Sequence, residues 1–174
     1  ILQSNGSQDD GILVEGTEEA PLDGFRIKGF TVEGFEGNGI HLRYVNNFRI
    51  DRNESINNEE NGIFPTLSAN GMVKRNLSYR SADSALWVEA STDVRVLDNV
   101  LHSSPTGLEV TVSNNIEIRG NEVYNNTVGI GLYHPNAASL PTIPEMGNWE
   151  IIDNYVHSNN APNNAPPGSM SSAL

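Results

Sequence analysis

The chain has 174 residues, of which 37% are hydrophobic and 16 are glycine, so it can bury one continuous core but not two. It contains no cysteine, which excludes disulfides, thiolate metal sites and a cysteine nucleophile. A formal net charge of −12, with 10 Lys and Arg residues spread along the sequence, argues against nucleic-acid binding. No apolar stretch is long enough to span a membrane.

A small residue followed by an aliphatic residue recurs along the chain at steps of 23, 23, 22 and 22 residues. The five pairs are Gly39-Ile40, Gly62-Ile63, Ala85-Leu86, Gly107-Leu108 and Gly129-Ile130. An asparagine series keeps nearly the same step, with one longer interval before its last member. Its members are Asn53, Asn76, Asn99, Asn121 and Asn154. Self-similarity at roughly 20 to 50 residues indicates a repeat architecture.

Each period holds short alternating runs broken by turns, and no window carries a sustained helical stripe. The pattern predicts an all-β fold, a right-handed single-stranded parallel β-helix solenoid of about six coils of 22–23 residues. The right hand follows the general bias of parallel crossovers. The predicted domain is single and covers 1–174. Its coils cover approximately 11–37, 38–60, 61–83, 84–105, 106–127 and 128–160, and 161–174 is a loop or the start of a truncated next coil.

The alternation within each strand predicts the side chains that fill the interior. From the first strand of each coil, the inward rows are Ile40, Ile63, Leu86, Leu108 and Ile130, and Leu42, Pro65, Val88, Val110 and Leu132. From the second strand they are Phe25, Phe48, Gly71, Val94, Ile116 and Trp149, and Ile27, Ile50, Val73, Val96, Ile118 and Ile151. The asparagine series follows the second strand, and we expect its amides to bond to one another in a buried ladder.

A solenoid needs capping elements because each terminal coil exposes strand edges and an open apolar bore. Neither end of this sequence supplies an obvious cap, and the chain starts at Ile1 without Met or a signal-like segment. We therefore expect an excerpt of a longer chain, with further coils or capping segments of that chain as partners.

Chemistry is expected on the outward side of the first strand, where aromatic, basic and acidic residues line up from coil to coil. The two outward columns are Leu13, His41, Phe64, Trp87, Glu109 and Gly131, and Glu15, Arg43, Thr66, Glu89, Thr111 and Tyr133. Aromatic rings pack on sugar rings, while carboxylates and Arg bond sugar hydroxyls, so this face can grip an extended glycan. The predicted binding residues are His41, Arg43, Phe64, Trp87, Tyr133 and His134.

Three further features receive plainer interpretations. A proline-rich insertion at 135–145 lands beside this face and is expected to wall off one end of a groove. A third-strand column of Tyr79, His102, Tyr124 and His157 is interpreted as covering a corner. A second-strand column of Arg26, Arg49, Arg95 and Arg119 is interpreted as a solvated face.

The Gly-Ile starts, the Asn at the bend and the segment TGLEVTVSNNIEIRGNEVYNNTVGIGLYHPN carry a family resemblance. Over roughly 11–160 the chain resembles the bacterial right-handed β-helix repeat proteins. That group is similar to pectate lyases, polygalacturonases, alginate C5-epimerases and the periplasmic maturation protein of nitrous oxide reductase. The resemblance implies an exported protein, extracellular or periplasmic, with a polysaccharide or other glycan as partner.

The resemblance also implies the chemistry to look for. Lyases and epimerases of this type need a base and a group that neutralises the uronate, for which His41, Arg43, Tyr133 and His134 are available. Hydrolases use paired carboxylates, for which Glu89 and Glu109 are the catalytic candidates, roughly 8 Å apart by strand geometry. The sequence contains no metal-binding motif and identifies no cofactor, and calcium stays open.

Three functions are consistent with the sequence. The first is an enzyme that binds and processes a polysaccharide on the first-strand face, as a lyase, epimerase or hydrolase. The second is a noncatalytic carbohydrate-binding module, and the third is a structural or accessory solenoid whose aromatics dock another protein. A raised pKa at Glu89 or Glu109 favours the enzyme, because a general acid must hold its proton near the working pH.

Overall fold

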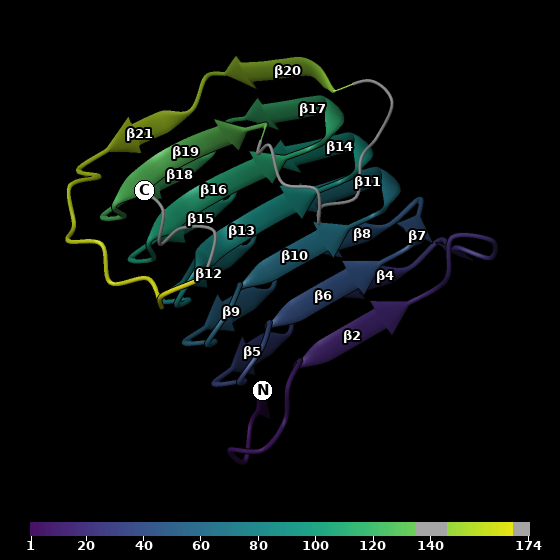
Figure 1. The fold of residues 1–174 in the computed structure, drawn as a ribbon, viewed down its shortest axis with the longest axis horizontal. Coiled ribbons are helices and arrows are strands. Elements are labelled where there is room, and N and C mark those ends of the chain that lie inside the picture. The colour runs from purple at the N-terminus through teal and green to yellow at the C-terminus, as the bar shows by residue number, and fades with distance from the viewer. Residues whose placement is uncertain (135–145, 169–174) are drawn as a thin grey trace.

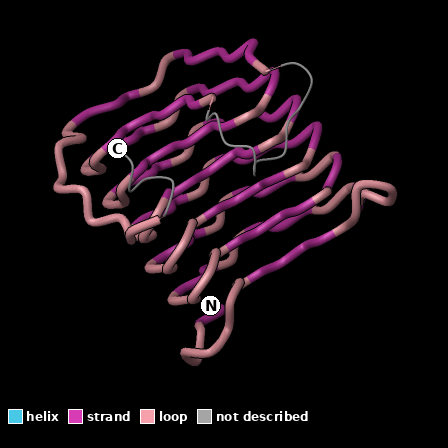
Figure 2. The backbone as a smooth tube through the Cα atoms, viewed as in Figure 1, coloured by secondary structure: helices cyan, strands magenta, loops and turns pink. Residues whose placement is uncertain are grey.

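The structure is a computed structural model that describes residues 1–134 and 146–168, and it is a parallel β-helix. Each strand pairs in parallel with its counterpart one coil away, so three sheets run along the stack of coils (Figure 1). Figure 2 shows strands joined by short loops, with no helix among the described residues. No described segment is therefore a helix able to cross a membrane.

Successive coils contribute to three sheets, here named A, B and C. Sheet A contains β1 (Leu2–Gln3), β5 (Thr31–Glu33), β9 (Glu54–Ile56), β12 (Leu77–Tyr79), β15 (Val100–His102), β18 (Glu122–Tyr124) and β21 (Tyr155–His157). Sheet B contains β2 (Ile12–Glu15), β6 (Ile40–Arg43), β10 (Ile63–Thr66), β13 (Ser84–Glu89), β16 (Thr106–Thr111) and β19 (Val128–Tyr133). Sheet C contains β3 (Leu22–Asp23), β4 (Arg26–Lys28), β7 (Val45–Asn46), β8 (Arg49–Asp51), β11 (Ala69–Lys74), β14 (Thr92–Leu97), β17 (Asn114–Arg119) and β20 (Gly147–Ile152).

The strand register agrees with the predicted repeat step and with the inward rows, although Ile151 of the edge strand β20 is 48% exposed. Sheet B takes one strand from each of six coils, and Ile63 pairs with Ile40 on one side and Leu86 on the other. All three side chains are fully buried. One coil contributes Gly71, which has no side chain, to an inward row. The ring of Phe48 occupies the space beside Gly71, and a Cβ on Gly71 would lie 2.0 Å from that ring. The core is thus a column of aliphatic side chains at strand spacing.

The asparagine ladder forms at the bend between sheets C and A. Asn76 donates to Asn99 at 2.9 Å, and Asn99 donates to Asn121 at 2.9 Å. The preceding residue in each coil adopts a left-handed conformation, as at Arg75 with φ of 54° and Asp98 with φ of 54°. This conformation turns the chain sharply and exposes backbone groups that the buried amides then satisfy.

Two further ladders line the other bends. Between sheets B and C, the hydroxyl of Ser91 accepts from the backbone N–H of Ser68 at 3.1 Å, and that of Ser113 accepts from Ser91 at 3.1 Å. Between sheets A and B, Asn126 donates to Asn159 at 3.0 Å. Among the described residues, each of the three kinds of bend therefore includes positions where a side chain bonds backbone that the turn leaves unpaired.

The C-terminal segment 158–168 leaves β21 and forms no further strand. It runs back along the stack, past the bend between sheets A and B (Figure 1), and the backbone N–H of Ala161 donates to Asn126 at 3.1 Å. This return brings Pro166 and Gly168 to the level of β10 and β13, beside sheet B. The insertion 135–145, predicted to wall a groove, lies outside the described residues.

Candidate functional site

The strand register brings the predicted first-strand residues onto one surface, the outward face of sheet B. His41 pairs with Phe64, Trp87 pairs with Glu109, and Glu109 pairs with Gly131. In the neighbouring column, Thr66 pairs with Glu89 and Thr111 pairs with Tyr133. Residues separated by 22 or 23 positions in sequence thereby become neighbours one strand apart.

Three rings of this face stack on one another. The ring centroids of His41 and Phe64 lie 4.9 Å apart, and those of Phe64 and Trp87 lie 4.7 Å apart, with interplanar angles of 22° and 20°. The Trp87 indole N–H donates to the Thr111 hydroxyl at 2.8 Å, which fixes the ring. Both faces of Phe64 are covered by its neighbours, so its edge is the part that a ligand can contact.

Glu109 occupies the next position of the same column and is fully buried. The Ser84 hydroxyl donates to its Oε2 at 2.7 Å, while its Oε1 has no hydrogen-bond partner. On the far side, Gly131 leaves a gap that the phenol of Tyr133 occupies, since a Cβ on Gly131 would lie 2.3 Å from Tyr133 Oη. The carboxyl group is therefore held between Trp87 and Tyr133.

This environment favours the protonated form of Glu109. Burial raises the pKa of Glu109 to about 7, the Ser84 hydrogen bond opposes the rise, and the charges of Asp83 and Glu89 add to it. Burial, together with the Glu109 charge, also raises the pKa of Tyr133. A carboxyl group with a pKa near neutrality can donate or accept a proton at working pH.

Glu89 lies in the neighbouring column and is 8% exposed. The Thr66 hydroxyl donates to its Oε2 at 2.9 Å. Burial raises the pKa of Glu89, while the Thr66 hydrogen bond and the nearby His41 act against that rise. Sheet B thus holds two outward-facing carboxyl groups whose charged forms are both disfavoured.

The remaining predicted residues lie toward the two ends of the face. His41 Nδ1 is 2.8 Å from Asp10 Oδ2, and its buried Nε2 has no partner. Arg43 is exposed and paired with Glu15 at 3.0 Å, and His134 is exposed just beyond β19. The structure therefore gathers Phe64, Trp87, Glu89, Glu109 and Tyr133 around one centre, with Arg43 and His134 outside it.

A cleft of about 490 Å³ opens beside the ring stack. It is lined by Glu59, Glu60, Asn61, Phe64, Asp83, Trp87, Pro166 and Gly168. Burial and then the charges of Asp10 and Asp9 raise the pKa of Glu60. The cleft joins two predicted aromatics to three carboxylates that sequence reasoning missed. The 23-residue step from Glu60 to Asp83 was a usable signal, whereas nothing in the repeat pointed to Pro166.

Ser84 was also missed, although it positions Glu109. Its coil neighbour Thr106 is a hydroxyl residue, but the bond from Ser84 to Glu109 runs diagonally over 25 residues and follows no repeat step. Across residues 1–134 and 146–168, no group of three or more His, Asp or Glu side chains is placed to hold a metal ion.

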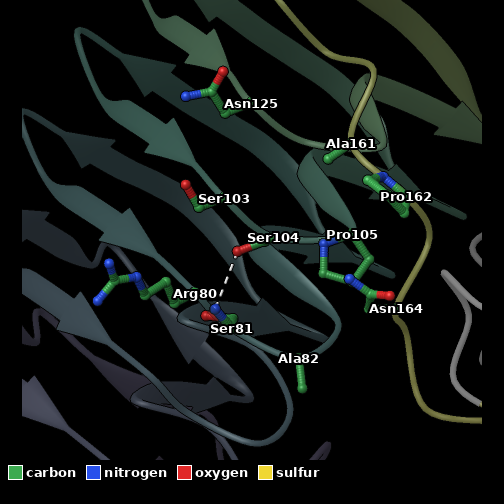
Figure 3. Close-up of a pocket in the computed structure, with 10 residues that line it drawn as sticks. All are labelled: Arg80, Ser81, Ala82, Ser103, Ser104, Pro105, Asn125, Ala161, Pro162 and Asn164. Atoms are coloured by element: carbon green, nitrogen blue, oxygen red, sulfur yellow. Dashed lines mark hydrogen bonds between the residues drawn. The ribbon is translucent and has the colours of Figure 1, made fainter.

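Another cleft, of about 310 Å³, lies where the C-terminal segment passes the bend between sheets A and B (Figure 3). Figure 3 shows Ser104 bonded to Ser81, with Ala161, Pro162 and Asn164 approaching from the C-terminal segment. Arg80 is the charged residue of its described lining, which holds neither a carboxylate nor an aromatic ring. This cleft lacks the groups that give the sheet B cleft its chemistry.

The family model described as "Right handed beta helix region" matches residues 2–140. The chain belongs to the right-handed β-helix family. The predicted right hand of the solenoid is confirmed with it. No curated protein matches the chain significantly in sequence.

Solved structures of the periplasmic alginate epimerase AlgG are similar to this β-helix protein. The AlgG structure has a TM-score of 0.66 at 20% identity, and two single-residue variants have TM-scores of 0.65 and 0.64 at 22% and 21% identity. Each match covers 76% of this chain and 39% of the AlgG chain. The chain therefore spans well under half of those proteins, and at this identity the likeness shows the fold.

Proposed function

We propose that this right-handed β-helix protein binds a polysaccharide in the sheet B cleft and processes it, with Glu109 exchanging a proton with the sugar. The observation that carries the proposal is Glu109 itself, a fully buried carboxyl group with an unpartnered oxygen and a pKa of about 7. The AlgG structures, described as a periplasmic alginate epimerase, support a polysaccharide substrate and an exported, periplasmic or extracellular location.

The cleft supplies the binding groups. The ring edges of the largely buried Phe64 and the half-buried Trp87 line the cleft and offer apolar contact to a sugar ring. Glu59, Glu60 and Asp83 can accept hydrogen bonds from its hydroxyl groups. Because the lining is acidic, a neutral, hydroxyl-rich stretch of polymer fits it directly. A uronate needs a bridging cation such as calcium there.

Glu109 follows Trp87 in the same column and is not part of the cleft lining. In this proposal, a sugar that extends from the cleft past Trp87 reaches Glu109 when the Tyr133 side chain rotates away from Gly131. The protonated carboxyl can then donate to a departing glycosidic oxygen, and the ionised one can remove a proton from a sugar carbon. Glu89 is the second carboxyl group, in the position of a partner for a hydrolase.

A noncatalytic carbohydrate-binding module is the second candidate. Its support is the complete burial of Glu109, which leaves the cleft aromatics and carboxylates as the groups that a ligand reaches without rearrangement.

The two candidates separate in one experiment. Binding and product release are measured on neutral and uronate polysaccharides, with and without calcium, for wild type, Trp87→Ala and Glu109→Gln. For the enzyme, we expect Glu109→Gln to lower turnover by at least about 100-fold while binding persists. Binding that is lost in Trp87→Ala, with no turnover in any protein, identifies the binding module. No interaction with any glycan contradicts both and leaves a structural solenoid.

A further inference from the structure

Basic residues that are scattered in the sequence gather on one face of the fold. Sheet C and the bend after it, over the first four coils, carry seven of the 10 Lys and Arg residues. They are Arg26, Lys28, Arg49, Arg52, Lys74, Arg75 and Arg95. Four carboxylates share this region, namely Asp23, Asp51, Asp93 and Asp98. The rest of the chain contains the other 18 carboxylates and only three basic residues. The patch therefore has a net positive charge on a protein that is acidic as a whole.

The register explains the gathering. Arg26 pairs with Arg49, Arg49 pairs with Met72, and Met72 pairs with Arg95, so three guanidinium groups share one outward column. Further along this column, Glu117 and Glu150 replace the arginines and end the patch. The patch therefore runs along the solenoid axis over four coils.

One buried carboxylate cannot neutralise these charges. Asp51 accepts ion pairs from Arg49 at 3.2 Å, Arg52 at 3.6 Å and Arg75 at 3.0 Å. Partial burial lowers the pKa of Lys74, and the nearby charges of Arg49 and Arg75 lower it further. Among the described residues, Arg26, Lys28, Lys74 and Arg95 form no ion pair. Their charge is available to an external anion.

The patch is also hollowed. A cleft of about 340 Å³ is lined by Arg26, Asn47, Phe48, Arg49, Asn70, Gly71, Met72, Asp93 and Arg95. A second cleft of about 240 Å³ continues it past Arg26 and Arg49 to Lys28. The exposed amide of Asn70 has no side-chain partner among the described residues, so it can bond a hydroxyl group.

We propose that sheet C holds a carboxylated polysaccharide along the solenoid axis. Arg26 and Arg95, which form no ion pair among the described residues, pair with separate sugar carboxylates, and Arg49, which Asp51 holds in place, adds its charge between them. Arginine bonds carboxylates in a bidentate fashion, and a uronate polymer presents one carboxylate per sugar. Asn47 and Asn70 provide hydrogen bonds for hydroxyl groups, and Met72 provides an apolar contact. This surface lies on a different face from the sheet B cleft, so it is independent of the proposed reaction.

The test uses polygalacturonate oligomers as the probe and their fully methyl-esterified counterparts as the uncharged control. Binding is measured by calorimetry for wild type, Arg26→Gln and Arg95→Gln. Arg80→Gln is the matched control, because it removes the same charge from an exposed position off sheet C. We expect each sheet C variant to weaken binding about fivefold to tenfold and Arg80→Gln to stay within about twofold. Added salt should weaken the wild-type complex.

Four results would overturn the proposal. The first is equal polygalacturonate affinity in wild type and all variants, and the second is equal affinity for the esterified oligomers. The third is equally tight binding of single-stranded DNA. The fourth is that the sheet C variants weaken only the association of the protein with itself and leave polygalacturonate affinity unchanged. Trp87→Ala and Glu109→Gln are measured beside them in calcium-free buffer, where the acidic sheet B cleft is not expected to take a uronate, and there they should leave polygalacturonate affinity unchanged. A loss in those two variants alone would place the uronate on sheet B and contradict the sheet C assignment.

Discussion

Sheets B and C are built from the same repeat, yet they shift the pKa of a buried carboxyl group in opposite directions. On sheet B, Glu109 has one hydroxyl donor and no cation beside it, and burial raises its pKa to about 7. On sheet C, Asp51 is also buried, at 3% exposure, but it lies among cations. There the Arg49 hydrogen bond and the Arg75 and Arg52 charges outweigh burial and lower its pKa. The neighbours, rather than the scaffold, decide which charge state each face keeps.

The comparison separates two uses of one architecture. A carboxyl group kept protonated near neutrality is poised for proton transfer, so sheet B is suited to chemistry. A carboxylate neutralised by arginines holds those arginines in place, so sheet C is suited to binding anions. Changes that invert one environment should leave the other intact, and the predictions below test that separation in order of expected effect.

The largest effect should come from the ladder that carries both faces. The buried Asn99 side chain accepts from the backbone N–H and the amide of Asn76, and it donates to Val73 and Asn121. We expect Asn99→Ala to lower the free energy of unfolding by about 3 kcal/mol, because it leaves buried groups unpaired. Chemical denaturation measures this, with Asn160→Ala as an exposed control that does not adopt a left-handed conformation. A loss no larger than the control's would contradict a stabilising ladder.

Glu109 should make sheet B weaken as pH rises. The unfolded chain ionises this group around 4.5 and the folded chain around 7, so stability falls across this window. We expect the difference in unfolding free energy between Glu109→Gln and wild type to shift in favour of the variant by about 3 kcal/mol between pH 4.5 and pH 7. Glu150→Gln, at an exposed position, is the control. A difference that does not change with pH would show that Glu109 ionises normally.

Asp51 should make sheet C weaken as pH falls. Its pKa lies below the ordinary 3.8, so its stabilising ion pairs persist above that pH and disappear as pH drops through the folded value. We expect Asp51→Asn to cost about 2 kcal/mol at neutral pH and much less in acid. Thermal melts at several pH values measure this. An equal cost at all pH values would mean that packing, rather than charge, explains the loss.

The smallest effect on stability should come from Arg95. Its side chain is exposed and makes no ion pair among the described residues, so Arg95→Gln should change the unfolding free energy by less than about 0.5 kcal/mol. The same variant should bind polygalacturonate more weakly. Denaturation and binding measured on one preparation compare the two effects. A clearly destabilised variant would make Arg95 a structural residue.

The repeat predicted the fold because its signals are local and periodic. The Gly-Ile pairs, the inward rows and the asparagine ladder recur at one step, and each is confirmed by the register. The same step placed Phe64, Trp87, Glu89, Glu109 and Tyr133 on one face. It could not show that Trp87 and Tyr133 enclose Glu109, because that depends on side-chain directions.

Other features were invisible because they cross the repeat. The cleft needs Pro166, which a nonrepetitive segment returns to sheet B. The sequence predicted the second-strand column of Arg26, Arg49 and Arg95 and interpreted it as a solvated face. It did not show that Arg52 and Arg75 from the bend join that column in one cationic patch.

The most direct test of the account is an NMR titration of the Glu109 carboxyl carbon, assigned by comparison with Glu109→Gln, in the free protein and with a bound oligosaccharide. The account predicts a midpoint at about 7 in the free protein and a shift of that midpoint when the sugar occupies the sheet B cleft. A midpoint near the ordinary 4.5 that is insensitive to every oligosaccharide that binds would contradict Glu109 as the proton-exchanging group.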